Sequence, residues 1–271
     1  MDRYVVIGNP IAHSLSPEIH ARFSHAAGDP IAYDRLLVPV GDFTAHARAF
    51  FESGGRGANV TLPFKVDAFR FASKASERAR LAGAANFLAR RGDSIEADNT
   101  DGAGLLADLT GNLALGLRGA RILLIGAGGA ARGVVAPLLG ASPAQLVVAN
   151  RSFDKAAELA RQFAHLGPVV PAALDAIPDA AYSVVINATS ASTRGEPLPL
   201  AAKVIGPGVL AYDMAYGAGA KDFVDRARSA GARASDGLGM LVEQAAESFF
   251  LWRGRRPDTG PVLAELRARL A

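Results

Sequence analysis

The residues of this chain that could carry out acid–base chemistry lie in its first half, where small polar side chains stand at the expected ends of strands and turns. Lys65 stands between Phe64 and Val66, and apolar neighbours disfavour the charged form of an amine, which prepares a lysine for proton transfer. A carboxylate would orient such a lysine, and Asp101 is the best candidate for it. The other small polar residues of this half are Ser14, Ser16, Asn59, Thr61, Asn86, Asn99 and Thr100. Hydroxyls and amides with one carboxylate suit a neutral, hydroxyl-rich substrate better than a phosphorylated one.

Simpler interpretations of Lys65 and Asp101 stay open at this point. A lone lysine is more often a surface cation, and Asp101 could serve as the N-cap of the helix that follows it. Sequence spacing alone does not bring the two side chains together.

A glycine-rich turn in the second half predicts a dinucleotide site. The segment 121–125 contains four consecutive apolar residues and reads as a buried strand, and it leads into the pattern Gly126-x-Gly128-x-x-Ala131. Gly126 allows a tight turn, Gly128 allows the backbone to approach a pyrophosphate, and Ala131 lets the helix pack close to the strand. The N–H groups at the start of that helix would face the phosphates. The pattern is weak evidence by itself.

The end of the next expected strand, 145–149, indicates which dinucleotide is bound. NAD sites usually carry an acidic residue there to accept hydrogen bonds from the ribose 2′-hydroxyl. Here Arg151 lies between Asn150 and Ser152, and Lys155 follows one helical turn later. Two cations suit a 2′-phosphate, so the sequence favours NADP over NAD, unless Arg151 is only a solvated charge at a strand end.

Alternating strands and helices predict an α/β fold in two parts that would position these residues. In the first part, 86–89 and 94–97 have the pattern of an antiparallel pair, so we expect a mixed sheet, and Ser16 is the expected N-cap of a helix over 17–27. From residue 121 the alternation is regular, which predicts a doubly wound parallel sheet of the Rossmann type. The other expected strands are 4–7, 33–38 and 57–60 in the first part, and 121–125, 145–149, 183–187, 209–213 and a short one near Ala232 in the second.

Composition narrows the class of protein. The chain has 271 residues, half of them hydrophobic, a net charge of +3 and no cysteine, which excludes disulfides, thiolate catalysis and cysteine-based metal sites. No basic cluster interleaved with aromatics supports nucleic-acid binding, and no apolar run approaches a membrane span or a secretory segment. His13 and His20 do not pair with carboxylates at ligand spacing, so no metal is expected. We expect a cytoplasmic protein.

An ordered set of segments resembles the shikimate/quinate dehydrogenase family over nearly the whole chain. Any one segment is weak, but the set in this order is highly specific. The segments are 8–17, 59–65, 81–86, 98–104, 126–133, 150–152, 187–190, 212–216 and 236–244.

The resemblance implies a fold, a reaction and site residues. It implies a discontinuous substrate-binding domain, 1–103 with 238–271, and an NADP-binding Rossmann domain, 104–237. It also implies reversible NADPH-dependent reduction of 3-dehydroshikimate to shikimate in aromatic amino-acid (chorismate) biosynthesis, with Lys65 and Asp101 as catalytic residues. The substrate positions are Ser14, Ser16, Asn59, Thr61, Asn86, Asp101, Tyr216 and Gln244. The cofactor positions are Glu77, Gly126, Ala127, Gly128, Gly129, Ala130, Asn150, Arg151, Ser152, Lys155, Thr189, Met214 and Gly237.

Some features leave alternatives open. Phe87 stands where the family usually has threonine, and it either turns into the core or alters the substrate site. Lys155 replaces a common arginine, so one bidentate phosphate contact becomes a point charge. Quinate or an amino-substituted shikimate could be the substrate, although Arg151 argues against quinate. A catalytically inactive NADP sensor would be expected to have lost Lys65 or Asp101, and both are present. Either a monomer or a homodimer is compatible with the sequence.

Overall fold

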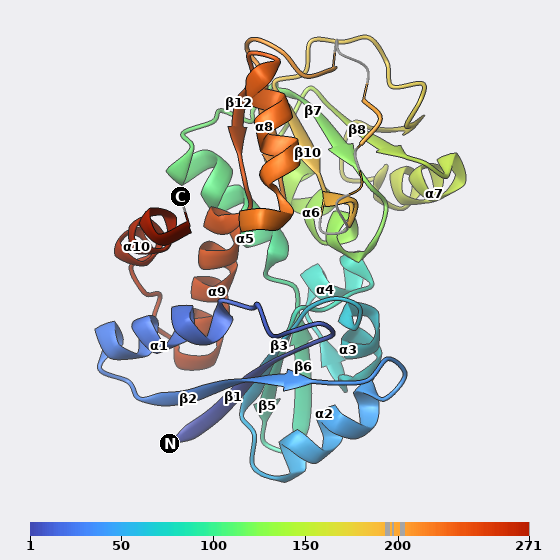
Figure 1. The fold of residues 1–271 in the computed structure, drawn as a ribbon. Coiled ribbons are helices and arrows are strands. Elements are labelled where there is room, and N and C mark those ends of the chain that lie inside the picture. The colour runs from blue at the N-terminus through green and yellow to red at the C-terminus, as the bar shows by residue number, and fades with distance from the viewer. Residues whose placement is uncertain (193–195, 197, 201–203, 271) are drawn as a thin grey trace. The chain divides into compact units, whose positions relative to one another are not determined.

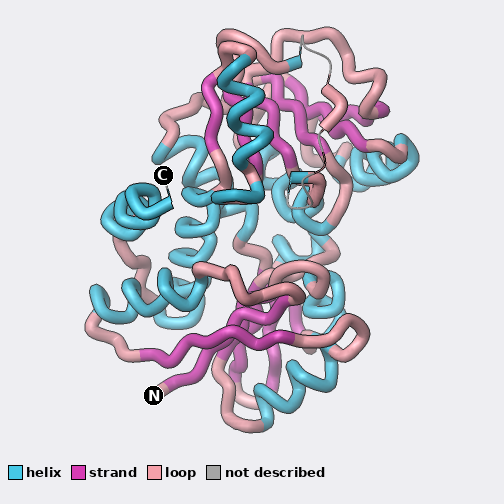
Figure 2. The backbone as a smooth tube through the Cα atoms, viewed as in Figure 1, coloured by secondary structure: helices cyan, strands magenta, loops and turns pink. Residues whose placement is uncertain are grey.

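The computed structural model describes residues 1–192, 196, 198–200 and 204–270, and the chain divides into two compact units. The first unit comprises residues 1–104 and 241–269, and the second comprises residues 105–240. Ala271, the last residue of the segment expected to return to the first domain, lies outside the described residues. Strands and helices alternate along the chain within each unit (Figure 2). No helix in the described part of the chain is long and apolar enough to cross a membrane.

The first unit is built on a mixed sheet, as expected (Figure 1). The sheet has six strands in the order β2-β1-β3-β5-β6-β4. The first strand pairs in parallel with β2 and β3, whereas β5 pairs antiparallel with β3 and β6. The elements are β1 (Asp2–Gly8), α1 (Ser16–Ala27), β2 (Ile31–Leu37), α2 (Phe43–Glu52), β3 (Gly57–Val60), α3 (Lys65–Phe71), β4 (Lys74–Ala75), α4 (Glu77–Ala82), β5 (Phe87–Arg91) and β6 (Ser94–Asp98). The chain enters the second unit through α5 (Asp101–Ala107) and returns through α9 (Leu238–Arg253), and α10 (Gly260–Leu270) follows.

The second unit carries an all-parallel sheet with the order β12-β11-β10-β7-β8-β9, so the doubly wound prediction is confirmed (Figure 1). The strand β7, which comes first along the chain in this unit, lies between β8 and β10, so the strand order reverses direction at β7. Sheets of this type bind ligands at such a reversal point. The elements are β7 (Arg121–Ile125), α6 (Gly129–Gly140), β8 (Gln145–Asn150), α7 (Phe153–Phe163), β9 (Val169–Ala173), β10 (Val184–Asn187), β11 (Leu210–Asp213), α8 (Lys221–Ser229) and β12 (Arg233–Ser235).

The strand β9 was not expected from the sequence. It contains Pro171, which lacks the N–H that a central strand would need, and so the segment does not read as a strand. In the structure β9 pairs only with β8 at the edge of the sheet, where a missing donor is tolerated.

The apolar side chains of the first unit alternate between the two faces of its sheet. Along β1, Val5 and Ile7 pack into one cluster, while Tyr4 and Val6 pack into the other. This follows from the two-residue period of a strand. Phe87 belongs to the second cluster, where its ring lies 5.1 Å from that of Trp252. The family departure at this position is therefore accommodated in the core.

The start of α1 differs from the expectation. The helix begins at Ser16 itself, Leu15 occupies the cap position, and no side chain caps it there. Instead, the Ser14 hydroxyl accepts a hydrogen bond from the Ser16 N–H at 3.3 Å. The hydroxyl of Ser16 is thus not used to cap its own helix.

Candidate functional site

Lys65 and Asp101 form an ion pair in the first unit. Lys65 is the first residue of α3 and Asp101 the first residue of α5, and the Lys65 Nζ lies 2.5 Å from the Asp101 Oδ2. Their side chains are 15% and 6% exposed, so the lysine is not a surface cation. The lysine is held in place by its backbone as well, because its carbonyl accepts the Ala85 N–H at 2.8 Å.

The second carboxylate oxygen of Asp101 binds an amide. Asn86 Nδ2 donates to Asp101 Oδ1 at 2.8 Å, so each oxygen of the carboxylate has its own donor. The backbone N–H of Asp101 donates to Asn99 Oδ1 at 3.1 Å, so the Asn99 side chain caps this end of α5. The carboxylate is directed at Lys65 and Asn86, which is the geometry of an oriented proton-transfer pair.

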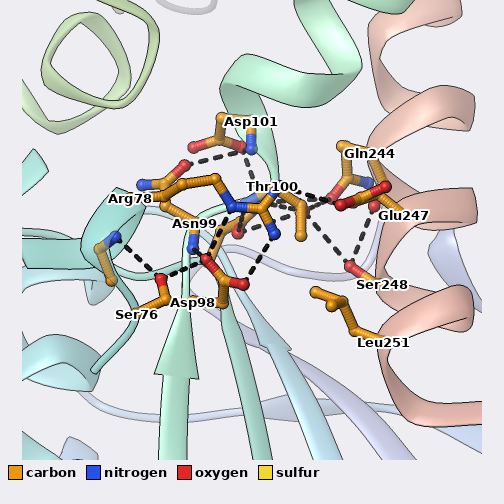
Figure 3. A network of polar contacts seen from close by, with 12 residues as sticks. Ser76, Arg78, Asp98, Asn99, Thr100, Asp101, Gln244, Glu247, Ser248 and Leu251 are labelled. Carbon is orange, nitrogen blue, oxygen red and sulfur yellow. Dashed lines mark hydrogen bonds and ion pairs between the residues drawn. The ribbon is translucent and has the colours of Figure 1, made fainter. Parts of the chain in front are cut away.

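A buried hydrogen-bond network surrounds Asn86 and includes Thr100, Asp101 and Gln244; these three partners are labelled in Figure 3. The Asn86 Oδ1 accepts the Thr100 N–H at 2.7 Å, and the Asn86 Nδ2 lies 3.3 Å from Gln244 Oε1. Gln244 comes from α9, and its Nε2 donates to the Leu241 carbonyl at 2.9 Å. Ser248, one turn further along α9, lies 3.3 Å from the Thr100 hydroxyl. Two segments far apart in the sequence, one with Asn86 and Thr100 and one with Gln244 and Ser248, thus present amide and hydroxyl groups at one place.

A charged anchor holds the turn that carries Asp101, and sequence reasoning missed it. Arg78 Nη2 lies 2.7 Å from Asp98 Oδ2, and its Nη1 lies 2.9 Å from Glu247 Oε1 (Figure 3). Asp98 Oδ1 accepts the Asn99 N–H at 2.7 Å. Burial raises the pKa of Asp98, but hydrogen bonds from Arg78 and Ser76 outweigh it and leave the pKa lowered. Asp98 opens the segment 98–104, which resembles the family pattern, and this resemblance is the only signal for the anchor in the sequence.

Asn59 and Thr61 lie on the strand and turn that precede Lys65. Asn59 Oδ1 accepts the Tyr33 hydroxyl at 2.8 Å, and its Nδ2 donates to the Asn86 carbonyl and to Ser248 Oγ at 3.2 and 2.9 Å. Both ends of the Asn59 amide are therefore bonded to protein groups. Thr61 is only partly buried, and its N–H donates to the Ile7 carbonyl at 2.9 Å.

Ser14 and Ser16 are brought together at the start of α1. The Ser14 carbonyl accepts two hydrogen bonds from the Arg35 guanidinium, at 3.1 and 2.6 Å. Ser16 is buried, with 5% of its surface exposed. Arg35 and Tyr33 both belong to β2, and the sequence offered no signal for either.

In the second unit the glycine-rich turn has the expected conformation. Gly126 has a φ of +116°, a backbone conformation that residues with a side chain rarely adopt. A Cβ at this position would also lie 3.1 Å from the Ala188 carbonyl oxygen. A cavity of about 210 Å³ opens beside this turn, and Gly128 occupies the cap position of α6 with open space around it. Ala130 lies in the first turn of α6. The cavity is lined by Ala127, Gly128, Asn150, Arg151, Ser152 and Lys155.

These residues fit a dinucleotide phosphate group. The start of α6 offers backbone N–H groups, Arg151 and Lys155 are both exposed, and no Cβ fills the space at Gly128 and Gly129. A second cavity of about 500 Å³ is lined in part by Asn150, Arg151 and Thr189, and is large enough for the nucleoside end of a cofactor.

The turns after β10 and β11 are tied together by a buried carboxylate. Asp213 Oδ2 accepts hydrogen bonds from Asn187 Nδ2 at 2.8 Å and Ser192 Oγ at 2.6 Å, and its Oδ1 accepts the Ala215 N–H at 2.8 Å. Burial raises the pKa of Asp213. Asn187 Oδ1 in turn accepts the Thr189 hydroxyl at 2.8 Å, so one pair positions both turns.

The remaining predicted residues lie on these turns or elsewhere. Met214 and Tyr216 follow β11, and Gly237 packs so closely on the Met214 carbonyl that a Cβ would collide with it. Glu77 is an exposed residue at the start of α4 in the first unit. Among the described residues no group of three His, Asp or Glu side chains could hold a metal ion.

Comparisons with protein families find three consecutive matches along the chain. Residues 6–88 match the shikimate dehydrogenase substrate binding domain, residues 108–195 the shikimate/quinate 5-dehydrogenase model, and residues 237–267 the shikimate 5′-dehydrogenase C-terminal domain.

Individual relatives and solved structures are similar to this chain over nearly its whole length. A shikimate dehydrogenase (NADP(+)) of Dechloromonas aromatica is 53% identical over 270 residues, which is 99% of this chain and 98% of the relative. The crystal structure of an Ael1 enzyme from Pseudomonas putida is 46% identical, has a TM-score of 0.92 and covers 98% of each chain. The shikimate 5-dehydrogenase of Thermus thermophilus, solved with NADP(H) and shikimate, is 30% identical, has a TM-score of 0.85 and covers both chains fully.

Proposed function

The chain belongs to the shikimate dehydrogenase family and is an NADP-dependent oxidoreductase acting on a CH–OH group, and from this premise we propose that Lys65 and Asp101 carry out its proton transfers. The reaction is the reversible reduction of 3-dehydroshikimate by NADPH and a proton, which yields shikimate and NADP⁺. This step belongs to aromatic amino-acid biosynthesis.

The observation that carries the proposal is the buried Lys65–Asp101 pair. When bound, the nicotinamide supplies a hydride to the ring carbonyl carbon. The carbonyl oxygen then becomes an alkoxide that needs a proton, and the Lys65 ammonium donates it. Asp101 keeps the ammonium oriented through the contact at 2.5 Å, and Asn86 holds the other carboxylate oxygen. In the oxidation direction the same pair removes the proton from the hydroxyl.

The residues around the pair would recognise the substrate. We assign the ring hydroxyls to Thr61, Asn86, Asp101 and Gln244, whose amide, hydroxyl and carboxylate groups suit several neutral donors and acceptors. We assign the carboxylate to the hydroxyls of Ser14 and Ser16. Asn59 is assigned to a ring hydroxyl on the family resemblance; both ends of its amide are bonded to protein groups, as are those of Asn86, so the two amides position each other as well. Tyr216 is assigned to the substrate on the family resemblance alone.

The second unit would bind NADP. The start of α6 with residues 126–130 would hold the pyrophosphate, and Arg151, Ser152 and Lys155 would hold the 2′-phosphate. We assign the nicotinamide end of the cofactor to Thr189, Met214 and Gly237, which lie on the turns after β10, β11 and β12. The hydrogen-bonded pair Asn187–Asp213 positions the first two of these turns. Glu77, in the first unit, is a cofactor residue by resemblance only. Residues 1–103 with 238–271 would then form the substrate-binding domain, and 104–237 the NADP-binding domain.

The test is oxidation of NADPH by 3-dehydroshikimate, followed at the cofactor absorbance, with product identification. Quinate and an amino-substituted shikimate, tested in the oxidation direction with NADP⁺ and NAD⁺, define the substrate and cofactor ranges. Lys65→Ala should abolish turnover while NADPH still binds. Lys74→Ala is the matched control, because Lys74 is exposed on β4 and lies 4.0 Å from Glu96. Loss of activity in both variants, or in neither, would refute the role of Lys65.

The setting of the enzyme is also proposed. Its partner is a small molecule, since the related Thermus thermophilus structure holds shikimate. We place the protein in the cytoplasm, where a biosynthetic reductase draws on NADPH, as a monomer or a homodimer. Size-exclusion chromatography with light scattering would decide between the two.

A further inference from the structure

Arg78 bonds two carboxylates that belong to different elements of the first unit. It is the second residue of α4, and its guanidinium lies between β6 and α9 (Figure 3). Its Nε donates to Asp98 Oδ1 at 3.0 Å and its Nη2 to Asp98 Oδ2 at 2.7 Å, which is a bidentate pair. Its Nη1 donates to Glu247 Oε1 at 2.9 Å. The planar fork of arginine suits these three contacts, whereas a lysine ammonium is a point charge.

The guanidinium is held at one place by its surroundings. The side chains of Asp98 and Glu247 are only 12% and 16% exposed, so water has little access to either ion pair. The start of α4 is fixed as well, because the Ser76 hydroxyl oxygen accepts the Ala79 N–H at 3.1 Å while its proton goes to Asp98. Arg78 therefore has a defined position relative to both β6 and α9.

Hydrogen bonds lead from Arg78 to the backbone of Asp101. Asp98 Oδ1, which accepts the Arg78 Nε, also accepts the Asn99 N–H at 2.7 Å. The Asn99 side chain then joins the next turn: its Oδ1 accepts the Asp101 N–H at 3.1 Å, and its Nδ2 donates to the Ala84 carbonyl at 3.0 Å. Arg78 thus fixes the segment from which the Asp101 carboxylate extends.

An acid–base pair is effective only when it is held in the right geometry, and a displacement of about 1 Å can cost roughly 100-fold in rate. Resting on the proposed function, we propose that Arg78 is a positioning residue that holds the Asp101 carboxylate in place for proton transfer by binding both Asp98 and Glu247. Arg78 itself moves no proton and contacts no substrate. Its effect on the rate passes through Asp101.

Replacing Arg78 by glutamine removes the charge and the fork but keeps a long polar side chain. For Arg78→Gln we expect kcat of shikimate oxidation to fall about 10- to 100-fold. KM for shikimate should stay within threefold, because Asp101 itself remains, and KM for NADP⁺ should stay within twofold. The value of kcat is expressed per NADPH-binding site, counted by fluorescence titration, so that unfolded protein does not contribute to the loss.

Arg256→Gln is the matched control, because Arg256 binds Glu247 as Arg78 does but has Glu243 instead of Asp98 as its second partner. The Arg256 Nη1 lies 2.7 Å from Glu247 Oε2, and its Nη2 lies 3.0 Å from Glu243 Oε2. Each variant therefore loses one ion pair with Glu247 and one with a second carboxylate. Arg256→Gln should keep kcat within twofold of wild type.

A double-mutant cycle tests whether Arg78 acts through Asp101. In an Asp101→Asn background, which lacks the proton-transfer carboxylate, adding Arg78→Gln should lower kcat less than twofold. If Arg78→Gln does not fold, because Asp98 has lost its cation, Arg78→Lys carries the same test with the charge retained. Arg78→Lys should lower kcat at least about threefold by itself and less than twofold in the Asp101→Asn background.

The outcomes separate this inference from the proposed function. If wild type does not reduce 3-dehydroshikimate, or if Lys65→Ala stays active, the proposed function fails and this inference fails with it. If wild type is active and Lys65→Ala is not, three results overturn the inference alone. These are a kcat within threefold of wild type in the folded Arg78 variants, an equal loss in Arg256→Gln, and losses that add to those of Asp101→Asn.

Discussion

Replacing Asp101 by asparagine tests the proton-transfer pair most sharply, because the substitution keeps the shape and removes the charge. In the structure the Asp101 carboxylate contacts Lys65 at 2.5 Å and Asn86 at 2.8 Å, and both side chains of the ion pair are largely buried. Asp101→Asn leaves the Lys65 ammonium without its anion and places two amides against each other. Breaking such a buried pair costs about 3 kcal/mol of folding free energy, and losing an oriented acid–base group lowers rates by roughly 10²- to 10⁴-fold.

We expect kcat of Asp101→Asn to fall about 100-fold, since Lys65 itself remains. KM for shikimate should rise because the Asp101 carboxylate is assigned to a ring hydroxyl of the substrate. KM for NADPH should stay within twofold of the wild-type value. The assay is steady-state oxidation of shikimate with each substrate varied, together with urea unfolding. Asp93→Asn, in the turn between β5 and β6, is the control and should match wild type. A folded Asp101→Asn enzyme with kcat within threefold of wild type would refute the pairing.

Three further predictions concern other parts of the molecule. Arg151→Asp should lower the ratio of kcat/KM for NADPH to that for NADH at least about tenfold, and an unchanged ratio would contradict a 2′-phosphate site there. Burial lowers the pKa of His20 to about 3; the unfolded chain therefore binds this proton first, and stability is lost as pH falls below about 6.5. In urea unfolding between pH 6 and 4, His20→Leu should lack a slope of about 1.4 kcal/mol per pH unit that wild type shows, and equal slopes would contradict a buried neutral His20. Arg35→Gln, which removes the cation bonded to the Ser14 carbonyl, should lower kcat/KM for shikimate about threefold at low salt and less at high salt, while a salt-independent loss would exclude an electrostatic role.

The sequence alone predicts site residues that lie near the ends of strands. Asn86 directly precedes β5, and Lys65 and Asp101 each begin a helix after a short turn that follows β3 or β6. Strand ends and turns are found from periodicity and turn residues. The Gly126 turn was equally visible, because its positive φ demands a glycine. The core strands of the second unit are continuous apolar runs, which made the parallel sheet predictable.

Other features depend on contacts that no local pattern records. Lys65 and Asp101 are 36 residues apart, and Asn86 and Gln244 are 158 apart, so only the packed fold shows that they meet. Tyr33 reads as an ordinary strand aromatic until its hydroxyl is seen against Asn59.

Two further features could not be predicted from the sequence. The strand β9 contains Pro171, which argues against a central strand, but a proline is tolerated in β9 because this strand lies at the edge of the sheet. The anchor formed by Arg78, Asp98 and Glu247 draws on three separate elements, and each residue alone resembles a surface charge.

In the proposed reaction a hydride passes from NADPH to the ring carbonyl carbon of 3-dehydroshikimate while Lys65 supplies the proton. The most direct measurement is a single turnover with NADPH that carries deuterium at the transferred position, with the product analysed by mass spectrometry. Wild type should give shikimate containing one deuterium, and Lys65→Ala should bind both reactants but form this product at least about 100-fold more slowly. Shikimate without deuterium would refute direct hydride transfer, and labelled product formed at the same rate by both proteins would refute the role of Lys65.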